Sequence, residues 1–91
     1  MNGLAGIARA LRSGRFAMTR LGDGSGVLLD IEGNQVLSLN ETGMFLLDAI
    51  AAGTAGEDAL LSAMLGAFDV DETTARADLD RFLAELRERL A

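Results

Sequence analysis

Residues 26–43, GVLLDIEGNQVLSLNETG, leave little freedom in how this chain can fold. Alternating apolar residues on both sides of a central Gly-Asn pair predict two strands joined by a tight hairpin. Asn40 follows directly on the second strand and is suited to cap a helix, because its side chain can accept from a free backbone N–H there. Leu39 and Met44 then occupy the two positions of a hydrophobic staple. The segment therefore predicts a strand pair joined without a linker to the helix that covers one of its faces.

The register of this hairpin follows from which residues it would bury. A two-residue turn would point the leucines of the return strand away from the core. A three-residue loop, residues 33–35, instead pairs Ile31 with Leu37 and keeps the apolar sets of both strands on one face, so it is the register we expect. Leu28 and Val36 then point outward together. The residues expected to face the core are Val27, Leu29, Ile31, Leu37 and Leu39.

The rest of the chain supplies a further strand and more helices. Apolar residues at i, i+3, i+4 and i+7 predict a short amphipathic helix over residues 4–12, and a weak alternation predicts a strand over 15–21. The later helices are expected over 41–52, from a capping box at 54–57 to Phe68, and from an Asp71 cap to Leu90. The fold class is therefore α+β and winged-helix-like: a three-stranded antiparallel sheet followed by three helices, with a possible extra N-terminal helix. We divide the chain into a basic amphipathic extension, 1–14, and a domain, 15–91.

The composition removes most routes to catalysis. None of the 91 residues is Cys or His, so the commonest general base, the best nucleophile and the usual transition-metal ligands are missing. We therefore expect no catalytic residue, no cofactor and no metal site. No apolar run approaches the roughly 18 residues of a membrane span, and we expect a cytoplasmic protein.

Charge is distributed unevenly along the chain. Residues 1–22 carry four Arg and no acid, whereas the remainder carries fourteen acids against four Arg, which gives a net charge of −6. The acidic body argues against nucleic-acid binding, because that binding depends on neutralising phosphates. The basic start could attract an acidic partner surface, or it could simply be a solvated helix face.

Several segments, taken in order, carry a resemblance to a known family. They are VLLD, GNQVLSLNETG, LLDAIAAGT, FDVD and DLDRFLAEL, and they lie within about residues 16–90. In this order and spacing the chain resembles the PqqD family, the small peptide-binding domains also called RiPP recognition elements. It departs from the family pattern where the usual aromatic after Thr-Gly is displaced to Phe45 by Met44.

The resemblance implies a non-catalytic peptide chaperone. Such a domain binds the leader region of a ribosomally synthesised precursor peptide by β-strand addition and presents it to a modifying enzyme. The implied partner enzyme is a radical-SAM protein, a cyclodehydratase, or a lasso-peptide protease or cyclase, in natural-product biosynthesis such as that of PQQ. Neither a nucleic acid nor a membrane is an implied partner.

The resemblance also implies that the peptide binds beside the strand at 35–39, in the groove against the last helix. Residues between Val36 and Leu39 include no Pro, Lys or other charge that would hinder pairing at the strand's edge. This absence separately favours an edge that binds a peptide. Leu83, at the border of the last helix's apolar stripe, could complete an apolar pocket, and two Arg of that helix could pair with acids of a leader. The candidate peptide-binding residues are Gln35, Val36, Leu37, Ser38, Leu39, Arg76, Leu79, Asp80, Leu83 and Arg87.

Three other functions stay open at this point. A winged-helix transcription regulator or DNA-binding protein needs a basic recognition helix, but residues 72–90 carry five acids against four Arg. An acyl carrier needs a serine at a helix start, whereas Ser38 lies in a predicted strand and Ser62 inside a predicted helix. A structural or oligomerisation module would pair the same strand edge with a second copy, forming a homodimer.

Overall fold

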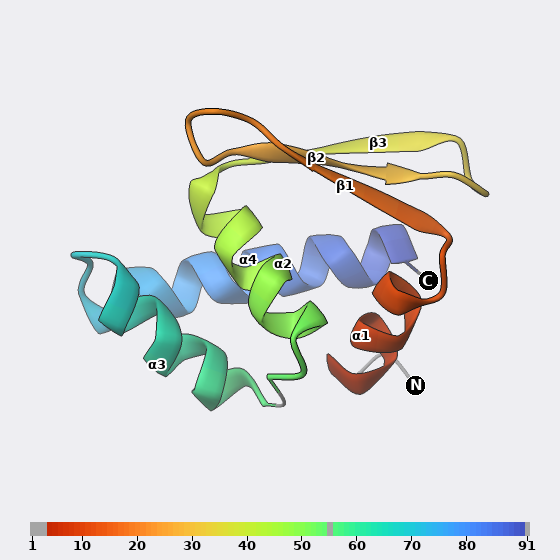
Figure 1. The fold of residues 1–91 in the computed structure, drawn as a ribbon. Helices are drawn as coiled ribbons and strands as arrows, with labels where there is room; N and C mark the ends of the chain where they lie inside the picture. The colour runs from red at the N-terminus through yellow and green to blue at the C-terminus, as the bar shows by residue number, and fades with distance from the viewer. Residues whose placement is uncertain (1–3, 55, 91) are drawn as a thin grey trace.

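One helix precedes the sheet and three follow it in the computed structural model, which describes residues 4–54 and 56–90. The elements are α1 (Leu4–Arg12), β1 (Phe16–Arg20), β2 (Gly26–Asp30), β3 (Gln35–Leu39), α2 (Glu41–Ala51), α3 (Glu57–Ala67) and α4 (Glu72–Leu90). In Figure 1 the strands form one layer and the helices lie on one side of it. The α+β fold class and its element order, including the N-terminal helix, are confirmed.

The sheet is antiparallel in the order β1-β2-β3, and its register differs from the expected one. Leu28 pairs with Leu37 across β2 and β3, so the connection is a four-residue loop over 31–34. Leu28 therefore faces the core, whereas Val27, Leu29 and Ile31 do not, against our expectation. Ile31 is 62% exposed, Leu29 is also exposed, and Val27 is only partly buried. The inward placement of Leu37 and Leu39 is confirmed, as is the outward placement of Val36.

Asp30 explains why the register differs. Its carboxylate is only 8% exposed, and it accepts hydrogen bonds from Arg15 Nε at 2.9 Å and Arg15 Nη2 at 2.8 Å. The same carboxylate accepts from the Gly33 N–H at 2.9 Å, and Asn34 completes the turn with a left-handed φ of 56°. A buried carboxylate is costly unless it is paired, and this pairing requires Asp30 to point inward. The residues beside it in β2 must then point outward.

The expected cap of α2 is present, that of α3 is not, and α4 begins at Glu72 directly after the expected cap Asp71. Asn40 caps α2, because its Oδ1 accepts from the Gly43 N–H at 2.8 Å, as expected. The capping box expected at 54–57 is wrong: α3 begins at Glu57 behind Gly56, which makes no side-chain cap bond. Gly56 has a φ of 111°, a conformation that favours glycine, so the turn into α3 depends on glycine at this position.

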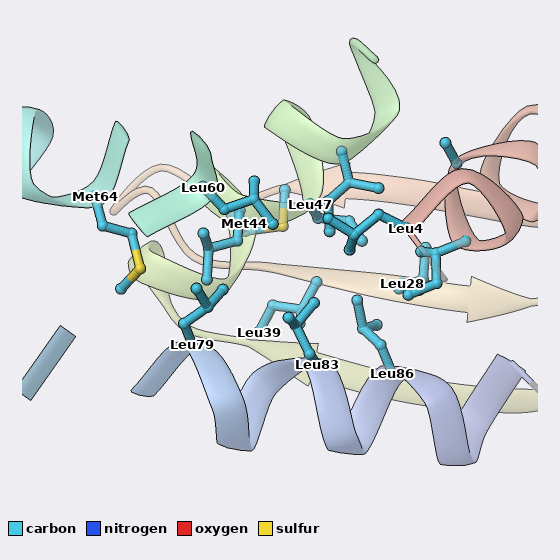
Figure 2. Packing of buried hydrophobic residues seen from close by; sticks show 14 of the residues in the cluster. Leu4, Leu28, Leu39, Met44, Leu47, Leu60, Met64, Leu79, Leu83 and Leu86 are labelled. Carbon is cyan, nitrogen blue, oxygen red and sulfur yellow. The ribbon is translucent and has the colours of Figure 1, made fainter. Parts of the chain in front are cut away.

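The core lies between the sheet and the helices, and α4 contributes to it along its length. Figure 2 shows Leu79, Leu83 and Leu86 of α4 reaching toward buried side chains of α2 and α3. Helix α1 adds Leu4, Ile7 and Ala8 to the same buried cluster. Residues on both sides of the predicted boundary at 14 thus share one core, and the division into 1–14 and 15–91 stays a prediction. The buried α2 and α3 residues in Figure 2 include Met44, Leu47, Leu60 and Met64.

Candidate functional site

The outer edge of β3 is the first component of the candidate site. Within residues 4–54 and 56–90, β3 is bonded to β2 on one side and to no strand on the other. The direction of the free backbone groups follows from two bonds between β1 and β2. The Ile31 N–H donates to the Arg15 carbonyl at 2.8 Å, and the Leu21 N–H donates to the Ser25 carbonyl at 2.8 Å. Odd-numbered residues of β2 therefore turn their main chain toward β1, and even-numbered residues turn it toward β3.

This alternation identifies the backbone groups that the open edge presents. Because Leu28 is opposite Leu37, the odd-numbered residues of β3 turn their main chain toward β2. Val36 and Ser38 consequently point their N–H and C=O groups outward. Their side chains lie on the sheet face away from the helices, where Val36 is 56% exposed. An extended peptide could pair with these two residues without disturbing the β2–β3 ladder.

A cavity of about 470 Å³ opens beside the C-terminal end of this edge. Its apolar lining comes from three elements: Leu39 at the end of β3, Leu46 in α2 and Phe82 in α4. Asp78, Arg81 and Glu85 of α4 line it as well, together with polar residues at the start of α2. This cavity adjoins Ser38 and Leu39, the last two residues of the strand whose backbone is open, and we call the space between β3 and α4 the groove.

Gly43 allows the cavity walls to meet. A Cβ atom at this position would lie 3.3 Å from Phe82 Cε1, 3.3 Å from Leu39 Cδ2 and 3.2 Å from Asn40 Oδ1. These distances are tighter than ordinary van der Waals contact, so a larger residue would force the ring of Phe82 or the α2 cap to shift. The Leu-Asn-Glu-Thr-Gly motif thus ends the strand, caps the helix and lets α4 approach both.

The opposite end of the groove lies at the start of β3. A smaller hollow there is lined by Gln35, Val36 and Leu37 together with Arg89 of α4. The Arg15–Asp30 pair lies beside it, and Glu88 joins Arg89 along this end. The hydrogen bonds from Arg15 are the main reason that the pKa of Asp30 is lowered to about 2. This end of the groove is therefore anchored by a carboxylate that stays ionised at neutral pH.

The face of α4 toward the groove is not the expected one. Arg76 donates to Asp58 at 3.2 Å and Arg87 donates to Glu57 at 3.3 Å, so both face α3 instead of β3. Leu79 and Leu83 are buried in the core, Leu83 with only 1% of its surface exposed, and Asp80 is exposed outside the cavity lining. Consecutive helical residues point in directions about 100° apart. Because we placed Leu83 at the groove where the structure has Phe82, the predicted groove-facing side of α4 is rotated by about this angle from the observed side. The groove residues that the sequence reasoning missed are Asp78, Arg81, Phe82, Glu85 and Arg89.

The strand half of the predicted set lies where it was expected. Ser38 and Leu39 line the cavity at the C-terminal end of β3, and Gln35, Val36 and Leu37 line the hollow at its start. The signal for the helix half was present in the spacing of Asp78, Phe82, Glu85 and Arg89, which repeats every three or four residues. Whether any of these residues contacts a peptide stays a prediction.

Two negative findings apply to the described part of the chain. None of its helices combines the length and the apolar character needed to cross a bilayer. Its Asp and Glu residues form no group of three or more that could hold a metal ion.

A solved structure shares this fold. It is described as TbiB1 in complex with the TbiA(beta) leader peptide, and it matches with a TM-score of 0.72 at 21% sequence identity. The match covers 84% of this chain and 86% of that one. At this identity the likeness establishes the shared fold, and leader-peptide binding is a property of TbiB1.

The family comparison covers the region that builds the groove. Residues 25–90 match the family described as coenzyme PQQ synthesis protein D (PqqD), which is more than half of the chain and includes β2, β3 and the three following helices. No curated protein sequence matches the chain significantly. On the family match, which agrees with the resemblance seen in the sequence, this chain belongs to the PqqD family.

Proposed function

We propose that this chain is a non-catalytic peptide chaperone that binds the leader region of a ribosomally synthesised precursor peptide. The leader adds a strand to the open edge of β3 and is held for a modifying enzyme. The observation that carries the proposal is the outward main chain of Val36 and Ser38 beside a cavity formed by β3, α2 and α4. Membership of the PqqD family and the fold shared with leader-bound TbiB1 support it.

The edge of β3 and the groove contribute to recognition in different ways. Val36 and Ser38 offer two N–H and two C=O groups, and each hydrogen bond contributes a net ~0.5–1.5 kcal/mol. This pairing hardly depends on the peptide's sequence, because it uses only main-chain groups. Alternate side chains of an added strand would point into the groove toward Phe82, and those supply the selectivity.

The chemistry belongs to a partner enzyme in this proposal. The chain contains no Cys or His, so its own groups are poorly suited to nucleophilic or general-base catalysis. The partner is a radical-SAM protein, a cyclodehydratase, or a lasso-peptide protease or cyclase, in PQQ biosynthesis or a related pathway. A homodimer formed through β3 would occupy the same edge and would compete with the leader.

Hydrogen exchange at single amides tests strand addition. Reading frames beside this protein's gene are first searched for a short precursor peptide, and the synthetic leader portion of that peptide is titrated into ¹⁵N-labelled protein. We expect a Kd of about 1 μM or below, near −8 kcal/mol. The amides of Val36 and Ser38 should become protected only in the complex, whereas those of Leu37 and Leu39, already facing β2, should be protected throughout.

Two results would contradict the proposal. One is a saturated complex in which the Val36 and Ser38 amides exchange as fast as in the free protein. The other is protection of both amides without peptide that grows with protein concentration, because that would identify the occupant of the edge as a second copy of the chain.

A further inference from the structure

The cavity of about 470 Å³ at the C-terminal end of β3 is lined by groups that favour one kind of side chain. We propose that this cavity accepts the side chain of a lysine or an arginine of the bound peptide. The inference rests on the proposed function, since it concerns which side chain the added strand delivers there. The half-buried ring of Phe82 provides apolar surface for the stem of such a side chain, and Glu85 provides the counter-charge.

The charges around the cavity leave one carboxylate available. Arg81 pairs with Asp78 at 2.7 Å, so these two side chains neutralise each other. Among the described residues, Glu85 makes no ion pair or side-chain hydrogen bond, and it is exposed one turn further along α4. The three charged side chains of the lining therefore sum to −1. A cation that entered the cavity would meet an acid without having to displace an existing partner.

The lining also suits the rest of a basic side chain. The ring of Phe82 lies against Gly43, within the same wall as Leu39 and Leu46. A long aliphatic stem can cover such a surface while its charged head stays partly hydrated near the rim. An aromatic ring close to a carboxylate favours a cation over a neutral or acidic group of similar size.

This preference is local to one end of the groove. At the start of β3 the lining holds Arg15 with Asp30 and Arg89 with Glu88, which together carry no net charge. The expected ligand is thus a peptide with one basic residue at the level of Leu39, whose groove-facing residues nearer the start of β3 meet a region with no net charge. A generally cationic peptide is not required.

Selection from a phage-displayed library of random twelve-residue peptides, against the full-length protein, tests this inference. We expect the selected peptides to share one Lys or Arg. Replacing that residue by norleucine in a synthetic copy, which keeps the stem and removes the charge, should weaken binding about five-fold. Glu85→Gln should weaken the parent peptide by a similar factor and leave the norleucine peptide unaffected. Glu72→Gln, an exposed acid on the same helix away from the cavity, is the matched control.

The outcomes separate this inference from the proposed function. Selected peptides that protect the Val36 and Ser38 amides but share no basic residue would overturn the inference and leave strand addition intact. A shared basic residue whose contribution is the same in Glu85→Gln and Glu72→Gln would also overturn it. A library that yields no peptide protecting these two amides would count against both.

Discussion

Leu83 and Phe82 are adjacent in α4, and the structure gives them different roles that a pair of alanine variants can separate. Leu83 is 1% exposed and lies in the core, whereas Phe82 is half-buried and lines the cavity beside β3. Leu83→Ala should therefore act on the stability of the fold. Phe82→Ala should act mainly on the groove.

The expected magnitudes follow from burial. Truncating a fully buried Leu to Ala costs about 2–5 kcal/mol, because transfer and cavity terms add. For Leu83→Ala we expect a loss of ~3 kcal/mol, out of a total stability of about 5–14 kcal/mol for a chain of this length. Phe82→Ala removes a ring that is only partly buried, so we expect a loss of about 1.5 kcal/mol. These losses correspond to decreases in Tm of roughly 12–24 °C and 6–12 °C.

Circular dichroism melts and urea titrations give the stability of each variant, and titration with the leader peptide at 10 °C gives affinity while both remain folded. Phe82→Ala should weaken peptide binding by about ten-fold, roughly the contribution of a buried aromatic contact. Leu83→Ala should change it much less. If Leu83→Ala lost affinity while its Tm stayed near that of the wild type, our assignment of the groove-facing side of α4 would be wrong.

Three further predictions concern the caps, the buried carboxylate and the open edge. Asn40→Ala should lower the free energy of unfolding by about 1 kcal/mol through the lost cap, whereas Thr54→Ala should change it by no more than ~0.5 kcal/mol. Equal losses in urea titrations would show that Thr54 does cap α3. The pKa of Asp30 is lowered to about 2 in the folded protein and is near 3.9 in the unfolded chain. Its contribution to stability is therefore fully present above pH ~4 and is lost as the pH falls toward ~2, so Asp30→Asn should flatten the acid limb of Tm against pH. An acid limb as steep as that of the wild type would contradict this. Ser38→Pro removes only an outward N–H and should fold yet bind the leader at least ~10-fold more weakly, whereas Leu37→Pro removes a β2–β3 bond and should unfold the protein. Our assignment of which β3 residues turn their main chain outward would be wrong if Ser38→Pro bound the leader as well as the wild type. It would also be wrong if Leu37→Pro melted cooperatively near the wild-type Tm.

Local signals in the sequence were sufficient for most of the fold. The period of the apolar residues placed α1 correctly, and Asn40 in front of an apolar helix placed the start of α2. The open edge of β3 was also predictable, because the strand pairs with its hairpin partner on one side and leads directly into α2. Each of these features depends on residues that are close together in the sequence.

The errors arose where a distant partner decides the outcome. Counting apolar residues could not show that Asp30 would be buried, because its partner Arg15 lies in the turn before β1. That one ion pair changed which side of β2 faces the core. In α4, packing against both the sheet and α3 drew Leu83 inward and left Phe82 at the groove. A one-residue difference in a helical period cannot be settled without knowing which neighbours the helix contacts.

The short stretch of outward main chain on β3 has a consequence for how long a leader stays bound. Backbone hydrogen bonds to two residues contribute only a modest binding free energy, consistent with a Kd of about 1 μM. With an ordinary association rate constant of about 10⁵–10⁷ M⁻¹s⁻¹, the dissociation rate is ~0.1–10 s⁻¹. A leader would then remain for roughly 0.1–10 s per visit, so one copy of the domain could serve many precursor molecules in succession.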